Sequence, residues 1–265
     1  METILPGDLD AALEAVASPG ATLLAGGTDL MVRINLQGHR PERVIALRRV
    51  EALRQWEGRF IGAGVTHRRL ERGPLRALAE AARTVGSPQI RNAGTIGGNV
   101  GTASPAGDTL PFLAAVDATV VVRSLRGERE LRWDEFFTGP KRTALAPDEL
   151  ILGIRLPEDV PTRQAFAKVG VRNAMVIAIA SCCVVRSEDG ATRVALGSVG
   201  PTPIRARRAE EMISAERRPS PAARAEFARL VAEEIKPITD HRSTAEFRRH
   251  AAGVLAARLL DRVAS

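Results

Sequence analysis

The chain has 265 residues and a formal net charge of +7, with 38 basic residues against 31 acidic ones. This length allows one large domain or two modest ones, and 45% hydrophobic with 26% charged residues is typical of a globular protein rather than a disordered one. The positive charge does not indicate a nucleic-acid binder, because nearly all the basic residues are arginines interleaved with acidic residues, without a basic cluster or stacking aromatics.

The absence of metal-binding motifs, of a secretory signal and of a long apolar run limits the metal chemistry and the location that we expect for the protein. Cys182 and Cys183 are adjacent, which fits neither a disulfide framework nor a CxxC metal site. An iron–sulfur cluster needs about four cysteine ligands, so any cluster would belong to another chain, and we predict no metal site. The first residues show no secretory signal and the apolar run 176–185 is too short for a bilayer, so we expect a cytoplasmic protein without a membrane span. The histidines lack metal-ligand spacing and are expected in surface or capping roles: His39, His67, His241 and His250.

Helices and short strands alternate in the first part of the chain. Asp8 is placed to cap a helix over residues 8–17, in which Leu9, Leu13 and Val16 share one face. A glycine-rich turn follows a predicted strand at 21–25, and the segment after that turn, 30–35, is helical or extended. The other predicted segments are apolar strands at 44–47 and 59–65 and helices at 67–71 and 75–85.

The stretch from Gly86 to Asp108 is rich in Gly, Asn, Ser and Thr and has neither a helical nor a strand period. We predict a loop here, and a loop of this length inside a compact domain is usually functional. Asp108 is expected to cap a helix over 109–116, and strands follow at 118–123 and 150–156.

The pattern changes near residue 160, where we place a domain boundary. Three strands in meander order are predicted, at 165–171, 176–186 and 193–199. The remainder is helical, over 206–215, 221–235 and 243–263, and the last helix opens with a capping box from Ser243 to Glu246. The sequence thus predicts domains at 1–160, divided near residue 55, and at 161–265.

Two glycine-rich segments carry the candidate chemistry. Gly26-Gly27-Thr28-Asp29 follows a strand, and consecutive backbone N–H groups in such a turn can hold an anion, although a tight turn that needs positive φ explains these glycines equally well. The stretch 95–108 offers hydroxyl and N–H donors beside small residues, which suits a diphosphate, and Asp108 could accept hydrogen bonds from ribityl or ribose hydroxyls. A structural Ω-loop is the alternative for this stretch. Together the two segments favour a nucleotide-type ligand.

Four motifs resemble the FAD-binding medium subunit of the molybdenum hydroxylases, the family that includes xanthine dehydrogenase and the aerobic carbon monoxide dehydrogenase. They are LLAGGTDL at 23–30, IRNAGTIGGN at 90–99, SPAGDTLP at 104–111 and GSVGPTPIR at 197–205. The resemblance covers nearly the whole chain. It implies an α+β fold, with a two-part FAD-binding domain of the vanillyl-alcohol-oxidase (PCMH) type and then a small domain with a three-stranded antiparallel sheet and helices.

The resemblance also implies a set of FAD-binding residues. The diphosphate would be wrapped by Ala25, Gly26, Gly27, Thr28, Asp29 and Leu30. The cradle and the ribityl chain would be completed by Thr95, Gly98, Asn99, Gly101, Thr102, Ser104 and Asp108, with Ile151 or Leu152 near the cofactor and Lys168 bonded to it. A lysine on an apolar strand is costly to bury unless it is paired, which supports a ligand contact, and a surface lysine at a strand edge is the alternative. Relatives often place a Tyr against the flavin ring, and this chain has none, so another residue must cover that face.

The functional prediction is an electron-transfer flavoprotein subunit of a heterotrimer. It would take electrons from [2Fe-2S] clusters of a small subunit, beside a molybdopterin-containing large subunit, and pass them to NAD⁺, oxygen or another acceptor. No catalytic acid or base is required, because the flavin carries the chemistry. Two alternatives stay open: a stand-alone FAD-dependent oxidase or dehydrogenase that acts on a small molecule, and a scaffold subunit that has lost its cofactor.

Overall fold

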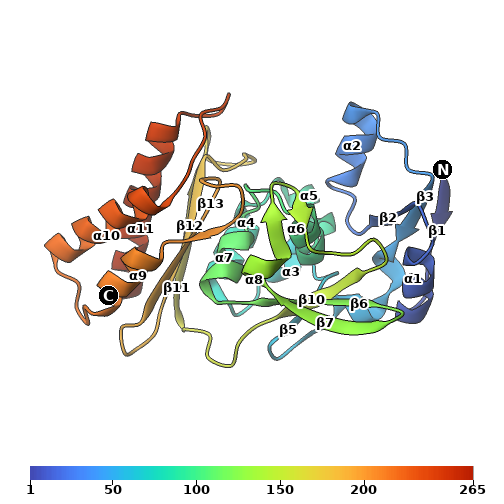
Figure 1. Ribbon diagram of the computed structural model, residues 1–265, viewed down its shortest axis with the longest axis horizontal. Helices are drawn as coiled ribbons and strands as arrows, with labels where there is room; N and C mark the ends of the chain where they lie inside the picture. The colour runs from blue at the N-terminus through green and yellow to red at the C-terminus, as the bar shows by residue number, and fades with distance from the viewer. Residues whose placement is uncertain (265) are drawn as a thin grey trace.

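The structure is a computed structural model that describes residues 1–264 (Figure 1). A small N-terminal sheet lies at one end, a five-stranded sheet with short helices lies in the middle, and a four-stranded sheet covered by three helices lies at the other end. Residues of the N-terminal and middle units share one hydrophobic core, and the C-terminal helices enclose a second core.

The N-terminal unit is a three-stranded parallel sheet in the order β1-β3-β2. Its elements are β1 (Glu2–Ile4), α1 (Leu9–Val16), β2 (Ala21–Leu24), α2 (Leu30–Gln37) and β3 (Arg43–Ala46). Asp8 caps α1 by accepting a hydrogen bond from the N–H of Ala11, and Leu13 and Val16 are buried, as the sequence predicts. β1 escapes prediction because it has only three residues, which are not periodically buried.

The middle unit is an antiparallel sheet in the order β4-β5-β10-β6-β7. Its strands are β4 (Trp56–Glu57), β5 (Phe60–Gly62), β6 (Thr119–Ser124), β7 (Gly127–Arg132) and β10 (Leu150–Arg155). The other elements of this unit are the 3₁₀ turns η1 (Leu47–Arg49) and η2 (Glu51–Arg54), the helices α3 (His67–Leu70), α4 (Arg76–Thr84), α5 (Pro88–Ala93), α6 (Ile96–Thr102), α7 (Leu110–Ala115) and α8 (Trp133–Phe136), and the hairpin of β8 (Phe137–Gly139) with β9 (Arg142–Thr143). β7 was not predicted, because it is a largely charged and exposed strand without a hydrophobic pattern.

The predicted loop over 86–108 is wrong in part, because α5 and α6 lie within it. Local capping explains both helices: Ser87 accepts a hydrogen bond from the N–H of Ile90, and Thr95 accepts one from the N–H of Gly98. Burial of one face of α6 then outweighs the low helix propensity of its glycines.

The predicted cap of α7 is also wrong. α7 begins at Leu110 and Thr109 occupies the capping position, whereas the Asp108 carboxylate accepts hydrogen bonds from Lys168 and Thr84. A buried ammonium offers this carboxylate a stronger partner than the backbone N–H groups of a short helix do.

The C-terminal unit is an antiparallel sheet of β11 (Arg163–Val169), β12 (Ala180–Arg186), β13 (Thr192–Gly197) and the two-residue strand β14 (Ile204–Arg205). α9 (Arg207–Ser214), α10 (Pro221–Glu234) and α11 (Ala245–Ala264) follow. The three predicted strands and three predicted helices are therefore present. β12 begins four residues later than expected, because residues 170–179 form a loop. α11 is capped by Thr244 rather than by Ser243, since the N–H of Phe247 donates to the Thr244 hydroxyl.

Both faces of the C-terminal sheet are buried. Alternating side chains of β12 enter different cores: Cys183 belongs to the core of the first two units, and Cys182 to the core under α9, α10 and α11. The two thiols therefore point to opposite faces of the sheet, and burial raises the pKa of each thiol well above its ordinary value.

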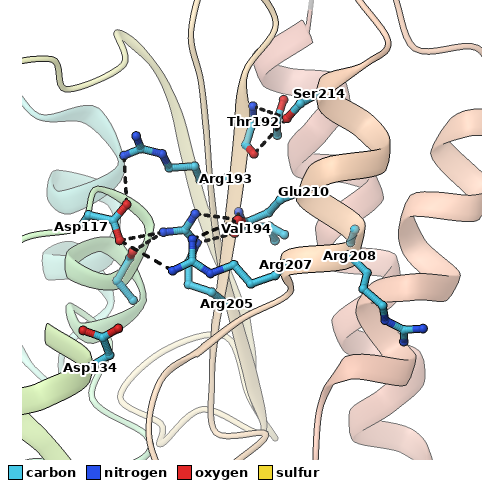
Figure 2. A network of polar contacts seen from close by, with 12 residues as sticks. Asp117, Asp134, Thr192, Arg193, Val194, Arg205, Arg207, Arg208, Glu210 and Ser214 are labelled. Carbon is cyan, nitrogen blue, oxygen red and sulfur yellow. Dashed lines mark hydrogen bonds and ion pairs between the residues drawn. The ribbon is translucent and has the colours of Figure 1, made fainter.

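A buried ion-pair network joins the C-terminal unit to the middle one (Figure 2). The guanidinium of Arg205 donates to both carboxylate oxygens of Glu210, to Asp117 at 3.0 Å and to the carbonyl of Ala114 at 3.1 Å. Arg193 pairs with the other oxygen of Asp117 at 3.4 Å. Since Asp117 and Ala114 lie at the end of α7, these bonds fix the C-terminal sheet against the helices that surround the site described next.

Candidate cofactor site

A cavity of about 990 Å³ lies among the N-terminal turn, α5, α6 and the loop between β11 and β12. This volume lies at the upper end of small-molecule pockets and suits a ligand of dinucleotide size. No group of three metal-ligating side chains occurs in the part of the chain that the structure describes. None of the helices within residues 1–264 has both the length and the apolar character needed to cross a membrane.

Most of the residues predicted to bind the cofactor come together at this cavity. Its wall includes Ala25, Gly26, Gly27, Thr28, Asp29, Leu30, Thr95, Gly98, Asn99, Gly101, Thr102, Ser104, Asp108 and Ile151. Leu152 and Lys168 do not line it. Adjacent residues on a strand point to opposite faces, which explains why Ile151 faces the cavity and Leu152 does not.

The two glycine-rich segments touch one another. A Cβ on Gly26 would stand only 1.9 Å from the carbonyl oxygen of Ala93, so no other residue fits there without displacing the backbone. Gly27 adopts a φ of +74°, a left-handed conformation that favours glycine. The alternative explanation, a tight turn that needs positive φ, is therefore correct for Gly27. The turn of residues 25–29 is thus held directly against the end of α5.

The second segment is anchored to the strand end at residues 63–67. The N–H of Ile96 donates to the carbonyl of Val65, and the N–H of Gly97 donates to that of Ala63, both at 2.9 Å. Because Gly97 has no side chain, α6 can lie directly on Ala63, where a Cβ would be 2.4 Å from its neighbour. This packing fixes the small residues of α6 along the cavity.

Asp108 combines burial with an unused acceptor. Its Oδ2 accepts hydrogen bonds from Lys168 Nζ at 2.5 Å and from the Thr84 hydroxyl at 3.2 Å, while Oδ1 is buried and has no partner. Burial raises the pKa of the Asp108 carboxyl, and the ammonium of Lys168 opposes that rise. A buried acceptor without a partner at the wall of a cavity is the arrangement expected of a ligand-binding group.

Lys168 lies behind Asp108, with its ammonium group fully bonded inside the protein. Besides Asp108, Nζ donates to the carbonyls of Thr84 at 2.9 Å and Val176 at 3.0 Å. Partners within the protein therefore compensate the burial of this lysine, whereas the sequence predicted a bond to the cofactor. The bond to Val176 also ties the loop 170–179 to the site, because Met175, Val176 and Ile177 line the cavity.

Several lining residues were not anticipated from the sequence. His67 was expected at the surface or in a cap, but only 3% of it is exposed, and burial, followed by the charge of Arg91, lowers the pKa of its imidazole to about 4. The loop residues 175–177 carry no sequence signal. No Phe or Trp side chain lines the cavity within residues 1–264, so aliphatic groups such as Ile90, Ile151 and Ile177 supply its apolar surface.

Comparison with known proteins identifies the family. Residues 1–159 match the FAD binding domain in molybdopterin dehydrogenase, and residues 165–263 match the CO dehydrogenase flavoprotein C-terminal domain. The chain belongs to this flavoprotein family. Its members are oxidoreductase subunits that carry FAD as cofactor, and the two matches confirm the α+β fold and the FAD cofactor expected from the sequence.

Individual relatives agree with this family. The chain is 37% identical over 215 residues to the nicotinate dehydrogenase FAD-subunit of Eubacterium barkeri, which covers 72% of this chain and 71% of the relative. It is 34% identical over 269 residues to the carbon monoxide dehydrogenase medium chain of Hydrogenophaga pseudoflava. That match covers 94% of this chain and 92% of the relative. A solved structure of the Hydrogenophaga pseudoflava carbon monoxide dehydrogenase superposes with a TM-score of 0.90 at 31% identity, covering 99% of this chain and 96% of that one.

The residues at the cavity fit FAD. Gly26, Gly27, Gly98 and Gly101 line the cavity without side chains, so a ligand can approach the backbone closely there, as a diphosphate requires. The unpartnered Oδ1 of Asp108 offers an acceptor for a hydroxyl. The volume of the cavity and its mixed apolar and polar wall also suit an isoalloxazine ring joined to a polar dinucleotide.

Proposed function

We propose that this chain is the FAD-carrying electron-transfer subunit of a cytoplasmic molybdenum hydroxylase complex, assembled as a heterotrimer. Electrons would come from the [2Fe-2S] clusters of a small subunit, which draws them from a molybdopterin-containing large subunit, and would leave to NAD⁺, oxygen or another acceptor. The main support is the cavity lined by both glycine-rich segments, in a chain that flavoprotein domains match over residues 1–159 and 165–263.

The cysteine content agrees with an external source of electrons. Both cysteines are buried, on opposite faces of β12, and two thiols are too few to ligate a cluster. The names of the relatives point the same way, since they describe a FAD-subunit in one dehydrogenase and a medium chain in another.

The residues would divide the binding of FAD among them. Backbone N–H groups of the turn 25–29 would hold the diphosphate. The N–H groups of Ile96, Gly97 and Gly98 are bonded within the protein, so the second segment would contribute the hydroxyl of Thr95 instead. Asn99, Thr102 and Ser104 would bind the ribityl chain together with Oδ1 of Asp108, and Ile151 would pack near the ring. When bound, FAD supplies the redox chemistry, while the protein supplies orientation and access to it.

Lys168 would act through its neighbours rather than by direct contact. Its bond to Asp108 keeps the carboxylate in place with Oδ1 free, and its bond to the Val176 carbonyl holds the loop 170–179 over the cavity. The aliphatic side chains of that loop would then cover the flavin where relatives use a tyrosine. A positive charge this close also favours a negatively charged form of the ligand.

Purification from the native host with metal and flavin analysis tests this proposal. We expect the chain to be isolated with two further subunits and with molybdenum, iron and FAD in the same complex. Isolation of the chain alone with FAD, together with direct oxidation of a small molecule, would replace this function with that of a stand-alone oxidase or dehydrogenase. A colourless chain that binds no added FAD would show that it is a scaffold.

A further inference from the structure

His67 is the one aromatic ring on the wall of the cavity, within the residues that the structure describes. It begins α3, and its backbone N–H donates to the carbonyl of Gly94 at 2.9 Å, which holds it beside the segment that starts at Thr95. Only 3% of the residue is exposed. The imidazole is therefore fixed by the backbone close to the proposed diphosphate cradle.

The edge of the ring that faces the cavity follows from its neighbours. Nδ1 is buried and has no hydrogen-bond partner. Cδ2, which is bonded to Nε2 on the other side of the ring, lies 3.1 Å from the point where a Cβ on Gly94 would stand, and Thr28 Oγ1 lies 3.3 Å from the same point. The Cδ2–Nε2 edge thus lies beside Gly94 and Thr28, at the meeting point of the two glycine-rich segments.

The charges around this ring keep it neutral. Arg91 is nearby in α5, where its guanidinium is bonded to Glu71 at 2.8 Å and to the carbonyls of Val85 and Gly86. Glu71, at the C-terminal cap of α3, also pairs with Arg68, so each of its carboxylate oxygens is bonded to an arginine. On the cavity side the charged lining residues are Asp29, Asp108, Arg33, Arg48 and Arg54. This largely basic surrounding and the burial of the ring favour an imidazole that carries a single proton.

A neutral imidazole has one N–H donor and one bare nitrogen. Nδ1 of His67 is buried without a hydrogen-bond partner, and Nε2 forms no hydrogen bond with any of residues 1–264. Nδ1 is enclosed by the protein, whereas Nε2 is not among the fully buried atoms and His67 lines the cavity, so Nε2 is the nitrogen that a ligand there can reach.

We propose that His67 donates a hydrogen bond from Nε2–H to the diphosphate of the bound dinucleotide, between the turn of Thr28 and the segment of Thr95. This inference rests on the proposed placement of FAD in the cavity. The diphosphate would then be held by three parts of the chain: the two glycine-rich segments and the first residue of α3. A hydrogen bond to a charged acceptor is among the stronger kinds, so its loss should be plainly measurable.

The test uses three substitutions that differ in where they place a donor. Full-length chain stripped of flavin is titrated with FAD, with the quenching of flavin fluorescence as the signal, for wild type, His67→Leu, His67→Gln and His67→Asn. The amide nitrogen of Gln reaches about as far as Nε2, and that of Asn about as far as Nδ1. Displacement of FAD by ADP, which keeps the diphosphate and lacks the flavin, measures the same contact separately.

We expect H67L to raise the Kd for FAD by about ten- to a hundredfold. H67Q should stay within about threefold of wild type and H67N should resemble H67L, because the donor is needed at Nε2. The loss in H67L should be equal for ADP and for FAD. Thermal unfolding without ligand serves as the control for folding, and if H67L does not fold, the difference between Gln and Asn decides.

Three results would overturn the inference and are distinct from failure of the proposed function. If wild type binds FAD and H67L binds it equally tightly, or if H67N is the variant that restores affinity, His67 is not the Nε2 donor, although the flavoprotein function stands. If ADP binding does not change in H67L, the contact is not with the diphosphate. If wild type binds no FAD, this inference and the proposed function fail together.

Discussion

Replacing Gly26 by Ala should separate the two glycine-rich segments that form the cofactor cavity. A Cβ at this position would lie 1.9 Å from the carbonyl oxygen of Ala93, 2.5 Å from its carbonyl carbon and 2.8 Å from Cα of Gly94. These are backbone atoms, so no side-chain rotation can relieve the overlap. One segment must move by about 1 Å or more before ordinary van der Waals contact is restored.

The expected cost follows from that displacement. Inserting an extra methyl group into a packed site costs about 1–3 kcal/mol, and the upper part of this range applies because the opposing atoms are backbone. For a chain of this size, about 2–3 kcal/mol corresponds to a fall of about 4–12 °C in the unfolding midpoint. The affinity for FAD should fall by more than tenfold, since the diphosphate cradle depends on the same contact.

Gly139→Ala is the matched control. A Cβ on Gly139 would meet only the side chain of Arg142, at 3.8 Å, and Gly139 does not line the cavity. Both variants are compared with wild type by thermal unfolding and by titration of flavin-free chain with FAD. We expect G139A to match wild type in both assays. If G26A did the same, the close contact between residue 26 and α5 would not exist, and the site built on it would be wrong.

Three further predictions concern ion pairs. Lys168→Met removes the charged partner of the buried Asp108 carboxylate, so we expect the free energy of unfolding in urea to fall by about 3–5 kcal/mol and FAD to bind more weakly. The double variant K168M/D108N should recover part of the lost stability. An unchanged FAD titration in K168M would contradict the role given to Lys168. Arg205→Met removes the bidentate partner of the buried Glu210 carboxylate and one of the partners of Asp117, and it should cost a similar amount. Wild-type stability in this variant would mean that the network does not hold the two parts of the chain together. Burial raises the pKa of Asp240, but hydrogen bonds from two backbone N–H groups and the charge of Arg248 outweigh it and lower the pKa to about 2. Since the pKa is about 3.9 in the unfolded chain, the stabilisation is complete above that pH and is lost as pH falls toward about 2. The difference in unfolding free energy between wild type and Asp240→Asn should therefore shrink over this range, and a constant difference would refute the assignment.

Periodic and capped segments were predictable from the sequence. The helix after Asp8 and the meander of the C-terminal sheet follow local rules, because apolar side chains recur at the period of the element and polar residues mark its ends. The motifs around Gly26 and Thr95 were also found, since small residues and hydroxyls there serve close approach of the backbone. Because these close approaches bring the two motifs together, most of the predicted FAD-binding residues line one cavity.

The remaining features depend on contacts between distant segments. α5 and α6 could not be recognised in a glycine-rich stretch, because their stability comes from caps and from packing against the strand end near Ala63. The position of Lys168 behind Asp108 depends on how β11 packs against α4, whose Thr84 is bonded to both residues, and no local pattern indicates it. His67 gave no signal, since a single histidine after a strand looks the same whether it ends in a cavity or at the surface.

The flow of electrons into the flavin tests the central claim most directly. The complex purified from the native host is titrated anaerobically with a limiting reductant that reduces its [2Fe-2S] clusters, while the visible absorption of the flavin is followed. We expect the flavin to be reduced together with the clusters and to be reoxidised when the acceptor is added. A flavin that stays oxidised while the clusters are reduced, or a complex without iron and molybdenum, would contradict the assignment of this chain as an electron-transfer subunit.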